Sequence, residues 1–118
     1  MLVMQRFVDI AAQQAAKSTF RYRLGAIVLN GREITGRGFN KTKTHPKLVQ
    51  YGHYTIHAEC DALLRAASGN ILIVVRLSKK GKLVCSKPCD KCMKYIKDYG
   101  IKKVYYINWD NNIQELTV

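Results

Sequence analysis

One histidine, one glutamate and two cysteines have the residue types and spacing of a catalytic metal site. His57 lies two residues before Glu59, and Cys89 and Cys92 are three residues apart later in the chain. An imidazole and two thiolates are ligands that zinc prefers, and three protein ligands leave the fourth position of a tetrahedral ion open for water. Such an ion lowers the pKa of its bound water toward about 7, which provides hydroxide at neutral pH. The pattern therefore predicts a catalytic zinc site with one ion per chain.

Glu59 is the candidate proton carrier of this site. It is too close in sequence to His57 to be a further ligand, and it is expected to share a rigid helical turn with it. A carboxylate beside the nucleophile can accept a proton from water, pass it to a ring nitrogen and assist the departure of ammonia. The expected chemistry is attack on a ring carbon that bears an exocyclic amine.

Two further cysteines leave a structural alternative open. Cys60 and Cys85 could complete a closed Cys₄ zinc site with Cys89 and Cys92. A zinc ribbon or ordinary core thiols would also explain a lone Cys-x-x-Cys pair. The His-x-Glu sequence and the Pro88 that precedes Cys89 favour the open site. We expect Cys60 and Cys85 to be small buried apolar residues.

Length and composition limit the class of protein. A chain of 118 residues with 47% apolar residues is expected to form one globular domain over residues 1–118. The longest aliphatic run is too short for a membrane span, and Arg6 and Asp9 interrupt the N-terminal segment, so we expect no membrane association and no signal peptide. Four cysteines in such a chain favour metal binding over disulfides, and we expect a cytoplasmic protein.

The chain is strongly basic. It has 20 Lys and Arg against 8 Asp and Glu, and a formal net charge of +12. A positive field of this size attracts anions such as nucleotides, RNA or DNA. A solvated basic surface without a specific partner explains the charge equally well, so charge alone leaves the partner open.

The first part of the chain is expected to form a helix followed by a β-hairpin. Apolar residues recur at helical spacing over 2–17. The Ile- and Val-rich run 24–30 predicts a strand buried on both faces, and the Asn-Gly pair after it predicts a tight turn into a strand over 33–40. In that second strand, Gly36 and Gly38 indicate a bulge or a close approach of the backbone to a ligand.

Two later helices are expected to place the metal ligands at their N-termini. The first spans 57–67, and the second begins at Pro88, runs to about Tyr99 and is capped by Gly100. The partial positive charge of each helix N-terminus favours the thiolate form of a nearby cysteine. Two helix starts would then point at one metal ion.

The remaining segments complete the expected sheet. A long loop covers 41–55, and strands are expected over 71–77 and 104–107. Segments 83–86 and 113–118 are optional further strands of the sheet. Because only a short turn separates the last two strands, any pairing between them must be antiparallel. The order of elements predicts an α/β fold, namely a three-layer α-β-α sandwich with a mixed sheet of four to five strands.

The motifs together resemble the cytidine deaminase superfamily. Its signature H-x-E…P-C-x-x-C is matched by His57-Ala58-Glu59 and by Pro88-Cys89-Asp90-Lys91-Cys92, and the similarity covers most of the chain. Segment 85–106 is similar to deoxycytidylate-deaminase-like proteins, including small ones encoded by phages, whereas the short last connection looks more like free cytidine deaminases. The resemblance implies His57, Cys89 and Cys92 as ligands of one Zn²⁺, Glu59 as the proton shuttle, and a homo-oligomer.

The resemblance also implies substrate-binding positions. Asn40, at the end of the second strand, matches an asparagine that binds the sugar in many members, and the backbone of Ala58 is expected to contact the base. Cations that flank Asn40 are expected to neutralise a 5′-phosphate. These cations are Arg37, Lys41, Lys43 and His45.

Three functions are open at this point. The first is hydrolytic deamination of a cytosine nucleotide or nucleoside, with deoxycytidylate favoured, to the uracil form. The second is editing of cytosine or adenine in single-stranded nucleic acid, which explains the +12 charge better and would use Tyr51, His53 and Tyr54 for stacking. The third is a non-catalytic basic nucleic-acid-binding module with a structural zinc, in which Glu59 has no role.

Overall fold

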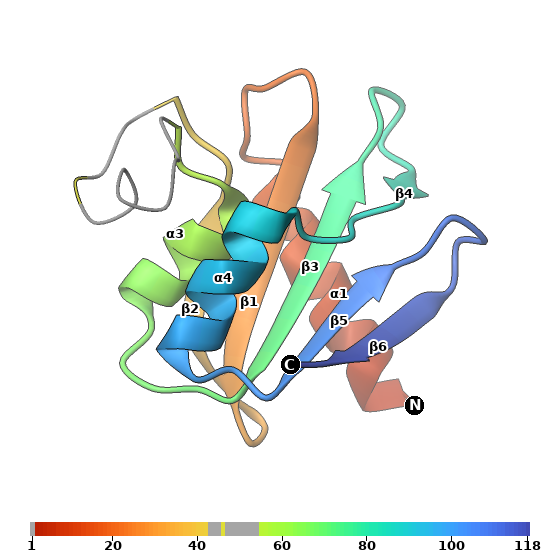
Figure 1. The fold of residues 1–118 in the computed structure, drawn as a ribbon. Coiled ribbons are helices and arrows are strands. Elements are labelled where there is room, and N and C mark those ends of the chain that lie inside the picture. The colour runs from red at the N-terminus through yellow and green to blue at the C-terminus, as the bar shows by residue number, and fades with distance from the viewer. Residues whose placement is uncertain (1, 43–45, 47–54) are drawn as a thin grey trace.

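The fold is one mixed β-sheet with helices on both faces (Figure 1). The structure is a computed structural model that describes residues 2–42, 46 and 55–118. Helix α1 (Leu2–Ala15) covers one face, and helices α3 (Ala58–Arg65) and α4 (Asp90–Tyr99) cover the other. The expected three-layer α/β sandwich is confirmed.

Six strands are described, one more than the largest expected number. The order is β2-β1-β3-β5-β6, with β4 paired to β3 outside this path. The count exceeds the prediction because both of the short segments that were expected to be optional join the sheet. The strands are β1 (Arg23–Asn30), β2 (Glu33–Phe39), β3 (Ile71–Leu77), β4 (Leu83–Val84), β5 (Lys103–Ile107) and β6 (Ile113–Thr117).

Strand directions follow the lengths of the connections. β1 pairs antiparallel with β2 through the tight turn and antiparallel with β3. β3 and β5 are parallel, because a crossover that contains β4 and α4 joins them. β5 and β6 are antiparallel, as the short last turn predicts. The turn contains Asn111 in the left-handed region, with φ of 65°.

Side chains of the central strands alternate between the two helix layers. Ala26 and Val28 of β1 pack in the core below α3 and α4, whereas Ile27 and Leu29 pack in the core against α1. β3 alternates in the same way, with Leu72 and Val74 on one side and Ile73 and Val75 on the other. Burial on both faces, predicted from the continuous apolar run 24–30, is therefore confirmed for β1, and β3 is buried on both faces as well.

Gly36 and Gly38 bring a helix close to the sheet rather than a ligand. A Cβ at Gly36 would lie 2.4 Å from the Ala62 carbonyl oxygen, and one at Gly38 would lie 2.4 Å from the Ala62 nitrogen. The expected approach to a ligand is thus replaced by contact with α3. A register shift between Val28 and Leu29 also marks the bulge that the glycines suggested.

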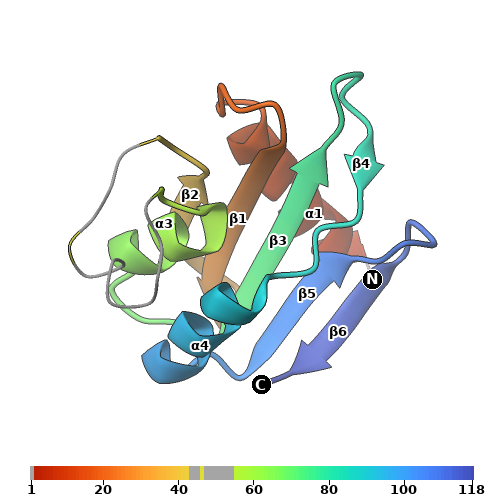
Figure 2. The same cartoon turned by 45° about the horizontal axis from the view of Figure 1, so that its top comes forward.

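Helices α3 and α4 begin side by side at one end of the sheet (Figure 2). His57 is the N-cap of α3 and Cys89 is the N-cap of α4, so α4 begins after Pro88 rather than at it. Gly100, with φ of 105°, ends α4 as predicted. Within the described ranges, every helix is too short or too polar to cross a lipid bilayer.

Candidate metal centre and its cavity

The three predicted ligands lie together at the helix starts. His57 Nδ1 is 3.1 Å from Cys92 Sγ and 3.9 Å from Cys89 Sγ, and all three ligand atoms lie within 4.8 Å of one another. Usual zinc bond lengths and tetrahedral angles separate a nitrogen and a sulfur ligand by about 3.6 Å. The two observed distances lie on either side of this value, so the donor set fits a single zinc ion.

The N-terminus of α4 prepares one thiol for metal binding. Cys89 is the N-cap, and its Sγ accepts a hydrogen bond of 3.4 Å from the Cys92 backbone N–H. Hydrogen bonding from the Cys92 side chain, and then from His57, lowers the pKa of the Cys89 thiol to about 3. Cys89 is therefore a thiolate at neutral pH, which is the form that binds zinc.

The other two ligands hold their protons more tightly. Hydrogen bonding to Cys60 and Cys89, together with burial, raises the pKa of Cys92 above its ordinary value. Hydrogen bonding to Cys89 raises the pKa of His57, although burial opposes it. Because zinc binds deprotonated ligands, loading the site releases these protons.

The described residues do not form a closed Cys₄ site. Cys60 is fully buried in the core below α3 and α4, as expected for a small apolar residue, and Cys85 is half-buried. Within the described part of the chain, the ligand cluster contains His57, Cys89 and Cys92 only. Three ligands leave room for a fourth that is not protein.

Glu59 lies beside this cluster in an environment that is unusual for a carboxylate. Its side chain is 2% exposed, and its Oε1 atom has no hydrogen-bond partner among the described residues. Burial raises the pKa of the Glu59 carboxyl above its ordinary value. A buried oxygen without a partner is costly to folding and indicates a role for a ligand or a solvent molecule.

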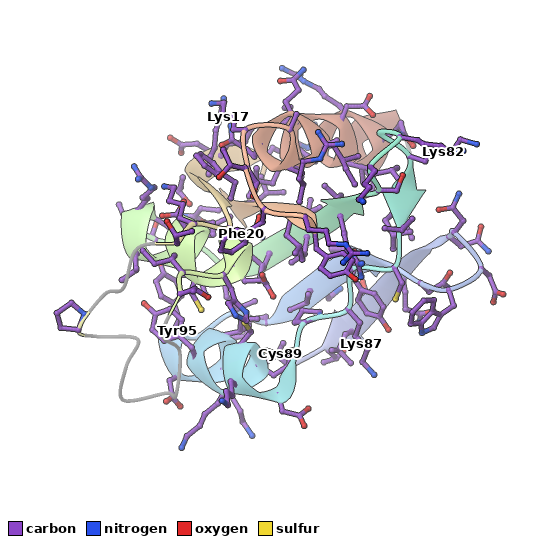
Figure 3. All side chains as sticks on the ribbon, turned by 90° about the horizontal axis from the view of Figure 1, so that it is seen from above. Lys17, Phe20, Lys82, Lys87, Cys89 and Tyr95 are labelled. Atoms are coloured by element: carbon purple, nitrogen blue, oxygen red, sulfur yellow. The ribbon has the colours of Figure 1, made fainter. Side chains whose placement is uncertain are left out.

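A cavity of about 490 Å³ opens onto the cluster. Its wall combines the metal-site residues with aromatic, apolar and cationic side chains from the connection between α1 and β1. In Figure 3, Phe20 lies on that connection, and Lys87 and Cys89 lie on the segment that leads into α4. The lining residues are Phe20, Arg21, Tyr22, Leu24, Asn40, Thr55, His57, Glu59, Lys87 and Cys89.

Asn40 lines this cavity, and its side chain also makes two hydrogen bonds to the backbone near the start of β1. Its Oδ1 accepts a hydrogen bond of 2.9 Å from the Leu24 N–H, and its Nδ2 donates one of 2.7 Å to the Tyr22 carbonyl. Each amide atom can make a second hydrogen bond, so ligand binding is compatible with these contacts. Ala58 is buried in the first turn of α3, where backbone N–H groups have no intrahelical partner.

The cations expected to bind phosphate do not line this cavity where the structure describes them. Arg37 lines two other surface cavities, away from the metal ligands. The Lys41 ammonium is 2.8 Å from Asp61 Oδ2 and lies 4.4 Å from the centre of the Phe39 ring. Lys43 and His45, and the stacking candidates Tyr51, His53 and Tyr54, lie outside the described residues.

Sequence reasoning missed two groups of residues at this end of the molecule. Buried Asp61 accepts hydrogen bonds from Lys41, Arg65 and the Phe39 N–H, which fixes the end of β2 on α3. The cavity wall at 20–22 and Lys87 were also missed. The alternation of aromatic and basic residues before β1, and the lysine just before the Pro-Cys pair, were the available signals.

Comparison with known proteins places these features in one family. The sequence matches the family model described as the cytidine and deoxycytidylate deaminase zinc-binding region over residues 2–108. Among curated proteins, no sequence matches this chain significantly.

Solved structures of deaminases have the same fold. The apo dCMP deaminase of cyanophage S-TIM5 is 27% identical with a TM-score of 0.68, over 92% of this chain and 84% of that one. The same enzyme in complex with dCMP and dUMP is 26% identical with a TM-score of 0.68, over 92% and 82%. Cytidine deaminase from Burkholderia pseudomallei, at 16% identity, has a TM-score of 0.67 over 96% and 91% and is similar in fold.

Proposed function

Because the chain belongs to the family defined by the cytidine and deoxycytidylate deaminase zinc-binding region, we propose that it hydrolyses the exocyclic amine of a cytosine nucleotide, with deoxycytidylate as the favoured substrate. Water and the cytosine ring give the uracil ring and ammonia. One observation carries the proposal, namely the buried Glu59 carboxyl with an unpartnered Oε1 beside His57, Cys89 and Cys92. A structural zinc site has no use for this carboxyl, which argues against the non-catalytic alternative.

The metal ligands and Glu59 have different roles in the proposed reaction. When bound by His57, Cys89 and Cys92, zinc supplies a Lewis acid that makes a water molecule acidic near neutral pH. Glu59 accepts the proton of the attacking water and delivers it to the ring nitrogen, and then assists protonation of the departing amine. Because Glu59 is buried, it exchanges these protons with the substrate rather than with bulk solvent.

The cavity wall supports recognition of a nucleotide. Asn40 lines the cavity, and we propose that it binds the sugar and that the first-turn backbone of Ala58 contacts the base. The exposed side chains of Arg21 and Lys87 are the cations on the described wall, and we propose that they take the phosphate role first expected for Arg37, Lys41, Lys43 and His45. The bound dCMP and dUMP of the cyanophage relative support a nucleotide over a nucleoside.

A substrate panel tests this proposal. Zinc-loaded protein is incubated with deoxycytidine, cytidine and their monophosphates, and ammonia release is measured. We expect the highest kcat/KM for deoxycytidylate. Replacing either Arg21 or Lys87 by Gln should raise KM for deoxycytidylate about tenfold, which corresponds to one charge-assisted hydrogen bond, and should leave KM for deoxycytidine unchanged.

A matched variant controls for net charge. Lys94→Gln removes an exposed cation of α4 that does not line the cavity, and we expect no change in KM for either substrate. Equal turnover of deoxycytidine and deoxycytidylate by the unchanged protein would contradict phosphate recognition. The cytoplasmic location and the homo-oligomer stay predictions.

A further inference from the structure

A second cavity adjoins the metal-site cavity. It measures about 470 Å³ and shares Arg21 and Tyr22 with the first, so these two residues form a common wall between them. We call this second cavity the Trp109 groove. Its lining residues are Arg21, Tyr22, Arg76, Ser78, Lys79, Val84, Cys85 and Trp109.

Two aromatic rings in the Trp109 groove are open to solvent. Trp109, in the turn between β5 and β6, is 88% exposed, and Tyr22, at the start of β1, is 54% exposed. Burying a ring of this size normally stabilises a fold, so an indole and a phenol that stay exposed in one groove are available to a ligand. Flat π faces of this kind stack nucleic-acid bases without regard to sequence.

The same groove is positively charged. The Arg76 guanidinium lies 4.3 Å from the centre of the Tyr22 ring, and the Arg21 guanidinium lies 5.6 Å from it. Lys79 is exposed at the rim, and Lys87 continues the charge into the metal-site cavity. Among the described residues, no Asp or Glu lines the groove. Cations interleaved with aromatic rings are the surface that tracks a sugar-phosphate backbone.

We propose that the Trp109 groove binds single-stranded nucleic acid, with a base stacked on Trp109, with Tyr22 and its two arginines forming the wall beside it, and with phosphates neutralised by the surrounding cations. The common wall places a strand in this groove next to the metal-site cavity. A cytosine of that strand would enter the site while its neighbours occupy the groove, and this part of the inference rests on the proposed function. A second copy of the chain fits less well, because it also carries a net charge of +12.

The single tryptophan of the chain reports directly on this groove. Zinc-loaded protein is titrated with a twelve-nucleotide oligothymidylate, which contains no cytosine and cannot be turned over, while Trp109 emission is recorded. We expect quenching by stacked bases, with a dissociation constant that rises with salt by a logarithmic slope of about 0.7 for each phosphate neutralised. The oligouridylate of the same length distinguishes RNA from DNA.

Variants separate stacking from charge. Trp109→Ala should weaken binding of a labelled oligonucleotide about 5- to 150-fold, measured by fluorescence anisotropy, with the salt slope unchanged. Trp109→Phe should restore most of the affinity. Lys79→Gln should reduce the salt slope by about 0.7. Lys102→Gln has the same net charge but lies before β5, beside the other end of β3, and should change neither quantity.

Three results would overturn the inference. The first is turnover of deoxycytidylate with no oligonucleotide binding at low salt, which leaves the proposed function intact. The second is equal loss of affinity in Lys79→Gln and Lys102→Gln without any effect of Trp109→Ala, which would indicate unspecific attraction. The third is a smaller assembly of Trp109→Ala in solution with unchanged oligonucleotide affinity, which would assign Trp109 to contacts between copies. Oligonucleotide binding by a protein that turns over no cytosine substrate would instead support the groove and contradict the proposed function.

Discussion

The two helix layers cover the same sheet with different chemistry. The α1 layer buries an apolar core around Phe7, Ile27 and Ile73, and the buried polar side chain of α1, Gln14, is uncharged. The α3–α4 layer buries comparable apolar side chains, but it also buries Glu59, Asp61 and two cysteines. Polar burial costs free energy unless each group has a partner. We infer that α1 serves mainly to stabilise the sheet. The α3–α4 layer contributes less free energy of folding for its buried area, because it holds the polar residues of the site.

Among the substitutions that test this comparison, the one at Glu59 is expected to have the largest effect. Glu59→Gln keeps the shape of the side chain and removes its ability to carry a proton, so kcat should fall by about 10²- to 10⁴-fold. Zinc content, measured by metal analysis, should stay at one ion per chain. Glu33→Gln, at an exposed position of β2, is the matched control and should keep full activity. Full activity of Glu59→Gln would remove Glu59 from the mechanism.

Two neighbouring residues of β3 allow the two layers to be compared at the same expected loss of stability. Leu72 faces the α3–α4 layer and Ile73 faces the α1 layer, and both are essentially buried. Leu72→Ala and Ile73→Ala should each reduce the free energy of unfolding by about 2–5 kcal/mol, measured by urea denaturation. Only Leu72→Ala should also weaken zinc affinity, measured by competition with a chelator. Equal loss of zinc affinity in both variants would mean that the layers are not independent.

Two glycines sharpen the comparison with a smaller expected effect. A Cβ at Gly25 would lie 2.1 Å from the Ala11 carbonyl oxygen of α1, and a Cβ at Gly38 would lie 2.4 Å from the Ala62 nitrogen of α3. Alanine at either position should cost about 1–3 kcal/mol of stability through overpacking. Gly38→Ala moves the helix that carries Glu59, so it should lower kcat of the zinc-loaded protein, whereas Gly25→Ala should not. Thermal unfolding and steady-state kinetics on the same samples measure both effects.

The parts of the site that could be predicted are those whose residues are close together in the sequence. His57 and Glu59 lie in one helical turn, and Cys89 and Cys92 in another. The spacing within each pair, together with the resemblance to a known signature, predicted the cluster of His57, Cys89 and Cys92. The apolar run of β1 likewise predicted a strand buried on both faces.

Contacts between distant segments were not predictable in this way. Arg21 and Tyr22 reach the cavity because the connection from α1 lies across the end of the sheet, and no local pattern records that path. Lys41 looked available for phosphate until the structure placed buried Asp61 beside it. The two glycines of β2 were correctly seen as points of close approach, but the sequence does not say what approaches.

The Asn40 amide has a consequence for what a ligand meets at the end of β2. Because Oδ1 accepts from one backbone N–H and Nδ2 donates to one backbone carbonyl, the amide cannot turn over without losing both hydrogen bonds. An aspartate of the same shape would present two acceptors and would repel the Tyr22 carbonyl oxygen. These two backbone contacts therefore fix which side of the Asn40 amide donates and which side accepts. A ligand meets one free N–H on Nδ2 and one free lone pair on Oδ1. Asn40 can therefore distinguish two ligands of the same shape in which a hydrogen-bond donor and a hydrogen-bond acceptor have exchanged places.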